Sequence, residues 1–152
     1  MQYVEERIKR LLQELETRIY PIKTPVSDIR MKKTREQYDP SAGINTTDWE
    51  VCPPEPLWGG HREYFWFSME VDISETFAGM PVEIEVRTGR EEPREKGEEW
   101  GWDALNPQFT AFVNGRIVQG LDINHRDILL TEQAKGGEHF TVVLSAFTGD
   151  QN

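Results

Sequence analysis

The sequence predicts a mainly β fold, an antiparallel β-sandwich or jelly roll, preceded by an N-terminal amphipathic helix and an extended connector. Three observations support this fold class. Apolar residues recur at helical spacing only in the first twenty positions. Beyond residue 57, apolar and polar residues alternate in several short runs, as in strands that bury one face. Two of these runs flank an Asn-Gly dipeptide, which is typical of a tight β-hairpin.

Residues 1–20 are predicted to form a helical arm, and residues 21–56 an extended connector. Pro21 and Pro25 end the helix, because proline lacks an amide hydrogen. The connector is polar, contains prolines and shows no periodicity, so we expect it to lie along a surface that another part of a parent protein covers. The apolar side chains of the helix recur on one face: Val4, Ile8, Leu11, Leu12, Leu15 and Ile19.

Residues 57–152 are expected to form the β domain. Alternation predicts strands over residues 64–73, 81–88 and 140–147. A hairpin is predicted from Phe109–Val113 and Arg116–Gln119, because Asn114-Gly115 between them tolerates the positive φ of a type I′ turn. Trp66 interrupts the polar face of its strand, so we expect it beneath a loop or the N-terminal helix.

Charge and cysteine content limit the partners and the compartment. The net charge is −10 and is spread along the chain, which disfavours nucleic acid and anionic membranes as partners. Cys52 is the only cysteine, and charged residues stand where a signal peptide needs an apolar core, so we expect a cytoplasmic location. No apolar run approaches the length that spans a membrane.

Two stretches carry motifs in a distinctive order. Leu57–Phe67 begins with Trp-Gly-Gly and continues into an aromatic strand. Val113–Leu130 contains the Asn-Gly turn, then Gln-Gly-Leu-Asp, an Asn-His pair and an aliphatic run, and is the more specific of the two. In order and approximate spacing, both resemble the amino-terminal region of glycoside hydrolase family 38, the cytoplasmic and vacuolar-type α-mannosidases.

The resemblance implies a β-sandwich of the galactose-binding-domain-like type that lies before a catalytic barrel. The family cleaves α-mannosidic bonds with retention, using an aspartate nucleophile and a zinc ion, all held by the barrel. Since this chain stops before such a barrel would begin, we expect a non-catalytic scaffold domain with no catalytic residue, metal or cofactor of its own. The partners that the resemblance implies are the downstream barrel with its zinc, homo-oligomer contacts and a mannose-containing oligosaccharide.

His125-Arg126-Asp127 combines two motifs that could indicate catalysis. His-x-Asp is a zinc-ligand spacing, but a catalytic zinc needs at least three protein ligands, and the spacing of His61 and His139 is uninformative. The same triplet begins a kinase catalytic loop, but the asparagine that should follow five residues after Asp127 is missing. We therefore expect a structural role for this segment.

Polar residues before that motif are candidates for an interface. We expect Asp122 to cap a turn, and Asn124 and His125 to bind backbone groups. The functional alternative is that these three side chains form a polar face against the downstream barrel, near its sugar site.

Tryptophans provide the other candidate sites. Trp100 and Trp102 flank Gly101, and in an extended chain both rings would point to one side. We expect them at a domain interface, and the alternative is a platform that stacks on a pyranose. Trp58 before Gly59-Gly60 is expected to anchor the entry to a strand. The neighbouring acidic cluster is expected to be solvated rather than to supply paired catalytic carboxylates: Glu91, Glu92, Glu95, Glu98 and Glu99.

Two other functions remain open at this point. The β domain could be a carbohydrate-binding module that uses Trp100 and Trp102. It could also be a free-standing protein-interaction domain that docks through its helix.

Overall fold

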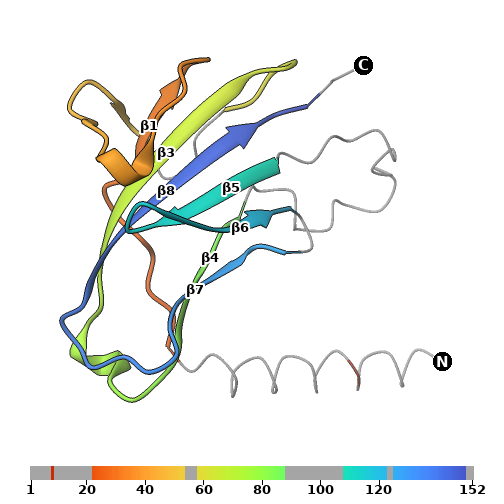
Figure 1. Cartoon of the computed structure of the whole chain (residues 1–152). Coiled ribbons are helices and arrows are strands. Elements are labelled where there is room, and N and C mark those ends of the chain that lie inside the picture. The colour runs from red at the N-terminus through yellow and green to blue at the C-terminus, as the bar shows by residue number, and fades with distance from the viewer. Residues whose placement is uncertain (1–7, 9–21, 54–57, 88–107, 123–124, 150–152) are drawn as a thin grey trace.

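The structure is a computed structural model that describes residue 8 and residues 22–53, 58–87, 108–122 and 125–149 (Figure 1). In this part of the chain the fold is mainly β and its sheets are antiparallel, as predicted. Apart from Ile8, the expected helical arm lies outside the described residues. So do the acidic cluster, Trp100, Trp102 and Asn124.

The strands of the described segments form one sheet of six and one of two (Figure 1). Every neighbouring pair is antiparallel. The large sheet has the order β2-β1-β3-β8-β5-β6, and the small sheet pairs β4 with β7. The bounds in chain order are β1 Arg30–Lys33, β2 Glu50–Val51, β3 Tyr64–Asp72, β4 Val82–Glu85, β5 Gln108–Val113, β6 Arg116–Leu121, β7 Asp127–Thr131 and β8 His139–Phe147, with short 3₁₀ helices η1 Pro40–Ala42 and η2 Glu75–Phe77.

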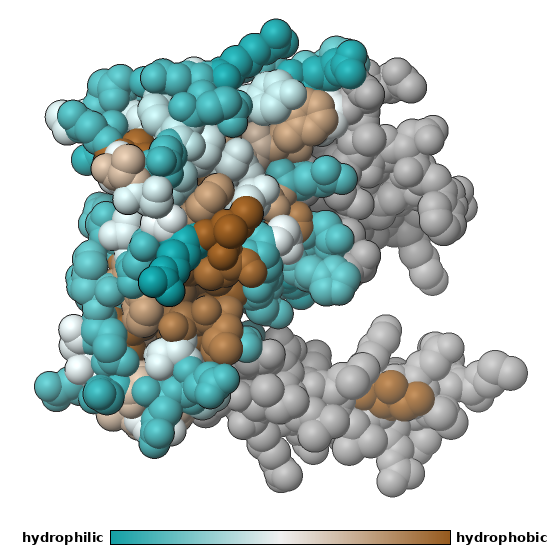
Figure 2. All heavy atoms as spheres, in the orientation of Figure 1, coloured by the Kyte–Doolittle hydropathy of each residue, from teal (hydrophilic) through white to brown (hydrophobic). Residues whose placement is uncertain are grey.

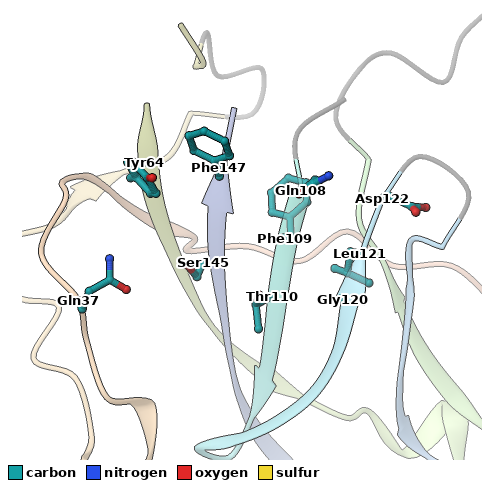
Figure 3. Close-up of a pocket in the computed structure, with 10 residues that line it drawn as sticks. All are labelled: Gln37, Tyr64, Gln108, Phe109, Thr110, Gly120, Leu121, Asp122, Ser145 and Phe147. Atoms are coloured by element: carbon teal, nitrogen blue, oxygen red, sulfur yellow. The ribbon is translucent and has the colours of Figure 1, made fainter. Parts of the chain in front are cut away.

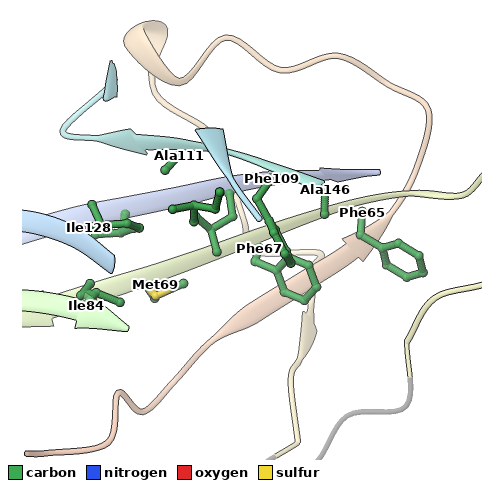
Figure 4. Close-up of a cluster of buried hydrophobic side chains, with 11 residues drawn as sticks. Phe65, Phe67, Met69, Ile84, Phe109, Ala111, Ile128 and Ala146 are labelled. Carbon is green, nitrogen blue, oxygen red and sulfur yellow. The ribbon is translucent and has the colours of Figure 1, made fainter. Parts of the chain in front are cut away.

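The core lies between the two sheets, on what we call the inner face of the large sheet. Alternate side chains of β3, including Phe67 and Met69, point to this face, and Leu144 of β8 joins them. Ile84 of β4 and Ile128 of β7 complete the cluster from the small sheet (Figure 4). The two sheets therefore bury their apolar faces in one core.

The opposite, outer face of the large sheet is covered in its middle by residues 34–49, which we call the covering loop. Trp66 of β3 and Val143 of β8 are buried here beneath Tyr38 and Trp49 of the loop. The ring centroids of Tyr38 and Trp66 lie 5.3 Å apart, and Trp66 Nε1 donates to the carbonyl of Glu36 at 3.2 Å. The prediction that Trp66 lies beneath a loop is confirmed.

Part of the predicted connector belongs to the large sheet. The sequence predicts no regular structure over residues 21–56, but β1 pairs with β3 and β2 pairs with β1. Met31 of β1 packs against the core, while Lys32 faces outward and binds Asp48 at 2.8 Å. Pairing with the long edge of β3 supplies the hydrogen bonds that make this charged segment a strand.

The predicted hairpin is confirmed. Asn114 and Gly115 both have positive φ, 48° and 79°, as a type I′ turn requires. A register shift between Ala111 and Phe112 adds an irregularity to the pairing of β5 with β6. The tip lies against η1, because a Cβ on Gly115 would be only 2.9 Å from the carbonyl oxygen of Pro40.

Candidate functional site

A hollow of about 500 Å³ opens on the outer face of the large sheet, beside the covering loop. We call it the outer-face pocket (Figure 3). Residues of the covering loop, of β3, β5, β6 and β8, and the residue after β6 line it. They are Gln37, Tyr64, Gln108, Phe109, Thr110, Gly120, Leu121, Asp122, Ser145 and Phe147.

Strand register brings most of these residues to one face. Thr110 of β5 is directly opposite Ser145 of β8 on one side and Gly120 of β6 on the other. Tyr64 of β3 is likewise opposite Phe147 of β8. Directly opposed residues of antiparallel strands point to the same side of a sheet, so the pairing itself sets these side chains in rows.

One rim of the pocket is aromatic. The rings of Tyr64 and Phe147 have centroids 4.8 Å apart and are tilted by 34°. Tyr64 is 36% exposed, which is high for a large aromatic side chain. The pair therefore presents an apolar surface near the polar side chains of the pocket (Figure 3).

The floor of the pocket carries polar groups with unused hydrogen-bonding capacity. Within the described part of the chain, the side chains of Gln108, Thr110 and Ser145 make no hydrogen bond. Gln37 uses one amide hydrogen, which it donates to the carbonyl of Arg35 at 3.3 Å. Amides and hydroxyls both donate and accept, so these groups can bind a ligand of either kind.

Gly120 keeps the floor open. A Cβ placed on it would meet only the carbonyl oxygen of Phe109, at 3.7 Å, which is an ordinary contact. Thr110, which is opposite Gly120 in the strand pairing, also lines the pocket. A side chain at position 120 would therefore project into the pocket beside Thr110. The pocket thus owes part of its depth to a missing side chain rather than to a special backbone conformation.

Asp122 closes the other rim and also shapes the turn after β6. Its Oδ1 accepts from the backbone amide of His125 at 2.8 Å and lies 3.1 Å from His125 Nδ1. The prediction that Asp122 caps a turn is confirmed. His125 is exposed, and it does not line the pocket.

Trp58 lies away from this pocket, on the core side. Its ring packs against Phe65, Phe67 and Phe109, with centroids 5.4, 5.1 and 5.7 Å away. Gly59 has a φ of +124°, as expected where the chain turns into β3. Trp58 therefore anchors the entry to the strand, as the sequence predicts.

A charged cluster lies elsewhere on the outer face, at the far end of β3 and β8. His139 Nδ1 is 2.7 Å from Asp72 Oδ1, and Nε2 is 2.6 Å from Glu70 Oε2. Hydrogen bonds to Asp72 and then to Glu70 raise the pKa of His139 above its ordinary value. Thr141 also donates to Glu70, at 2.8 Å.

The remaining candidate chemistry is sparse in the described residues. They contain no group of three His, Cys, Asp or Glu side chains that could hold a metal ion. Cys52 is half-buried against the core, and this burial raises the pKa of its thiol, which disfavours the reactive thiolate.

Among the described residues, no helix is both long and apolar enough to cross a membrane. Comparisons with protein-family models, with curated proteins and with solved structures give no match.

Proposed function

We propose that the chain is the non-catalytic N-terminal domain of a cytoplasmic, retaining α-mannosidase similar to glycoside hydrolase family 38. In this proposal the two sheets are the halves of a β-sandwich that scaffolds a downstream zinc-dependent barrel. The barrel would supply the catalytic residues and the metal.

One observation supports the proposal above the others. The two stretches that carry the resemblance are separated by 45 residues, 68 to 112, yet they pack in the same core. Phe65 and Phe67 come from the first stretch, and Leu121 and Ile128 come from the second. Motifs that define a domain are expected to meet in its core, and these two do.

An exposed apolar surface provides further support. Ile117 and Val118 of β6 are 68% and 46% exposed, and Leu129 of β7 is 45% exposed. We call these three residues the apolar strip. In the view of Figure 2, apolar side chains gather in the middle of the molecular surface, over the region of β4, β6 and β7 in Figure 1. Contiguous exposed apolar surface is typical of a face that another polypeptide covers.

Activity assays on two chains test the proposal. The 152-residue chain should not hydrolyse p-nitrophenyl α-mannoside, whereas the product of the complete reading frame, supplied with zinc, should hydrolyse it and retain the anomeric configuration. Hydrolysis by the 152-residue chain alone would overturn the proposal. A complete product that is folded, loaded with zinc and inactive on α-mannosides would also overturn it.

A matched pair of variants tests the scaffold role in the complete product. Leu129 and Glu83 are directly opposite each other on the outward face of the small sheet. Leu129→Asp places a charge in the apolar strip and should lower the thermal stability and the active fraction of the complete product. Glu83→Gln is the control and should leave both unchanged. If the two variants have the same thermal stability and the same active fraction, the apolar strip is not part of an interface.

A further inference from the structure

We propose that the outer-face pocket binds a neutral saccharide, with a pyranose ring against Tyr64 and Phe147 and its hydroxyls bound by the polar floor. This inference goes beyond the scaffold role. It depends on the described residues of this chain alone, so its test is independent of the α-mannosidase assignment.

The floor has the chemistry that sugar hydroxyls require. A hydroxyl donates one hydrogen bond and accepts others, so a sugar site needs groups that do both in a small area. Gln108, Thr110 and Ser145 are such groups, and their side chains are uncommitted within the described part of the chain. Gln37 adds a fourth from the covering loop. Without a ligand, these donors and acceptors must form hydrogen bonds with water.

The aromatic rim has the shape that the apolar face of a pyranose requires. Sugar rings carry C–H groups on one face, and these pack against aromatic rings through apolar contact. Tyr64 and Phe147 stand together at the mouth, and the polar floor begins directly beside them. Phe147 shares β8 with Ser145, two residues away on the same face, so ring and hydroxyl contacts fall within the span of one sugar.

The charge of the lining favours a neutral ligand. Among the described residues that line the pocket, Asp122 is the only charged one, and its carboxylate already accepts a hydrogen bond from His125. In the described part of the lining there is no lysine or arginine that could pair with a phosphate, sulfate or carboxylate. The net charge of −10 further disfavours anionic ligands.

Strand pairing favours a sugar over a peptide. Extended peptides commonly bind by adding a strand to a free sheet edge, where main-chain groups are available. Strands β3, β5 and β8 lie inside the large sheet and are paired on both sides. Among the strands that line the pocket, only β6, which contributes Gly120 and Leu121, lies at the edge of the sheet. Over the other three strands recognition must come from side chains, which suits a small ligand with many hydroxyls.

An NMR titration tests the proposal. Methyl α-mannopyranoside and methyl α-glucopyranoside are added to the ¹⁵N-labelled 152-residue chain, with methyl β-glucuronide as the anionic control. For a monosaccharide in so open a pocket we expect a dissociation constant of about 1 mM. At least one neutral glycoside should give saturable shifts at the amides of Thr110, Gly120 and Ser145, and the glucuronide should bind more weakly.

Three variants locate the site. Gly120→Val fills the floor and Tyr64→Ala removes an aromatic ring, so each should weaken binding about tenfold or more. Leu129→Ala removes an exposed side chain from the other sheet and should leave affinity unchanged. If Gly120→Val disturbs the fold, as judged by the dispersion of its amide signals, Ser145→Ala replaces it.

Three results would overturn the proposal. One is that neither neutral glycoside gives saturable shifts at about 100 mM, a hundred times the expected dissociation constant. Another is unchanged affinity in folded Gly120→Val or Ser145→Ala. The third is shifts at the pocket amides with a short asparagine-containing peptide and none with the glycosides, which would assign the pocket to polypeptide.

Discussion

Asn114 and Thr141 bind each other through backbone and side chain at once. The amide of Asn114 donates to the carbonyl of Thr141, and the amide of Thr141 donates to Asn114 Oδ1, both at 2.9 Å. The tip of the β5–β6 hairpin is thereby tied to β8, while its other side lies against η1. A turn that is predictable from a dipeptide thus becomes a junction between distant parts of the chain.

Gly115→Ala should destabilise the fold by about 1–3 kcal/mol. Its φ of +79° disfavours any side chain, and the new Cβ would lie 2.9 Å from the Pro40 carbonyl oxygen. Urea unfolding followed by tryptophan fluorescence measures the effect. Gly120→Ala is the control, because its Cβ meets only the carbonyl oxygen of Phe109, at 3.7 Å, and alanine restricts the unfolded chain. Equal free energies of unfolding would contradict the packing of the hairpin against η1.

Thr148→Val should cost about 1–3 kcal/mol in the free energy of unfolding. Thr148 is 4% exposed, and its hydroxyl donates to the carbonyl of Gly60 at 2.6 Å and accepts from the amide of Glu63 at 2.9 Å. Valine has nearly the same shape but leaves both backbone groups without their partner. Chemical denaturation of the two chains measures the difference.

Thr141→Val is the matched control for that substitution. The Thr141 hydroxyl donates to the carboxylate of Glu70 at the surface, where water can replace it, so this change should cost less than about 1 kcal/mol. If Thr141→Val costs as much as Thr148→Val, burial of the Thr148 hydroxyl is not what stabilises the Gly60–Glu63 turn.

The stabilising effect of His139 should depend on pH. Its pKa is raised in the folded protein by Asp72 and Glu70, so the protonated imidazole stabilises the fold. This contribution is fully present below the unfolded pKa of about 6.5 and is lost as pH rises through the higher folded value. His139→Gln should therefore lower Tm more at pH 5.5 than at pH 8.5.

Salt provides the control for this ion cluster. His139 is exposed, so 0.5 M NaCl should reduce the pH-dependent part of the difference. A difference in Tm that is the same at both pH values would show that the imidazole acts through contact or through neutral hydrogen bonds alone.

Cys52 should react slowly with iodoacetamide at pH 8. Burial raises the pKa of its thiol, and the residue packs against the core, so both the thiolate fraction and access are low. We expect alkylation at least about tenfold slower than in the urea-unfolded chain, measured by mass spectrometry. Equal rates would mean that the segment before β3 opens freely.

Local signals account for the part of the fold that the sequence could predict. The alternation in β3, β4 and β8 and the Asn114-Gly115 turn depend on neighbouring residues only, and each of these elements appears where predicted. Strand β1 could not be found this way. Arg30–Lys33 contains one apolar residue, Met31, and becomes a strand because the edge of β3 is available for pairing.

The outer-face pocket could not be predicted for a related reason. Its residues come from the covering loop, from four strands and from the residue after β6. Gly120, Leu121 and Asp122 belong to the Gln-Gly-Leu-Asp motif, but no motif joins them to the residues of the other strands. Tyr64, Thr110 and Ser145 are ordinary strand residues until register places them together. Alternation over residues 140–147 predicts that Ser145 faces away from the core, but it does not predict which residues of other strands lie beside it.

The order of strands in the large sheet has a consequence for synthesis on the ribosome. β8 follows every other strand of this sheet in the chain, yet it lies between β3 and β5 and joins the two sides. Until residues 139–147 leave the exit tunnel, the long edge of β3 that faces β8 has no partner. The nascent chain must therefore wait with an open edge, a state in which chaperones or a neighbouring ribosome's product compete for it.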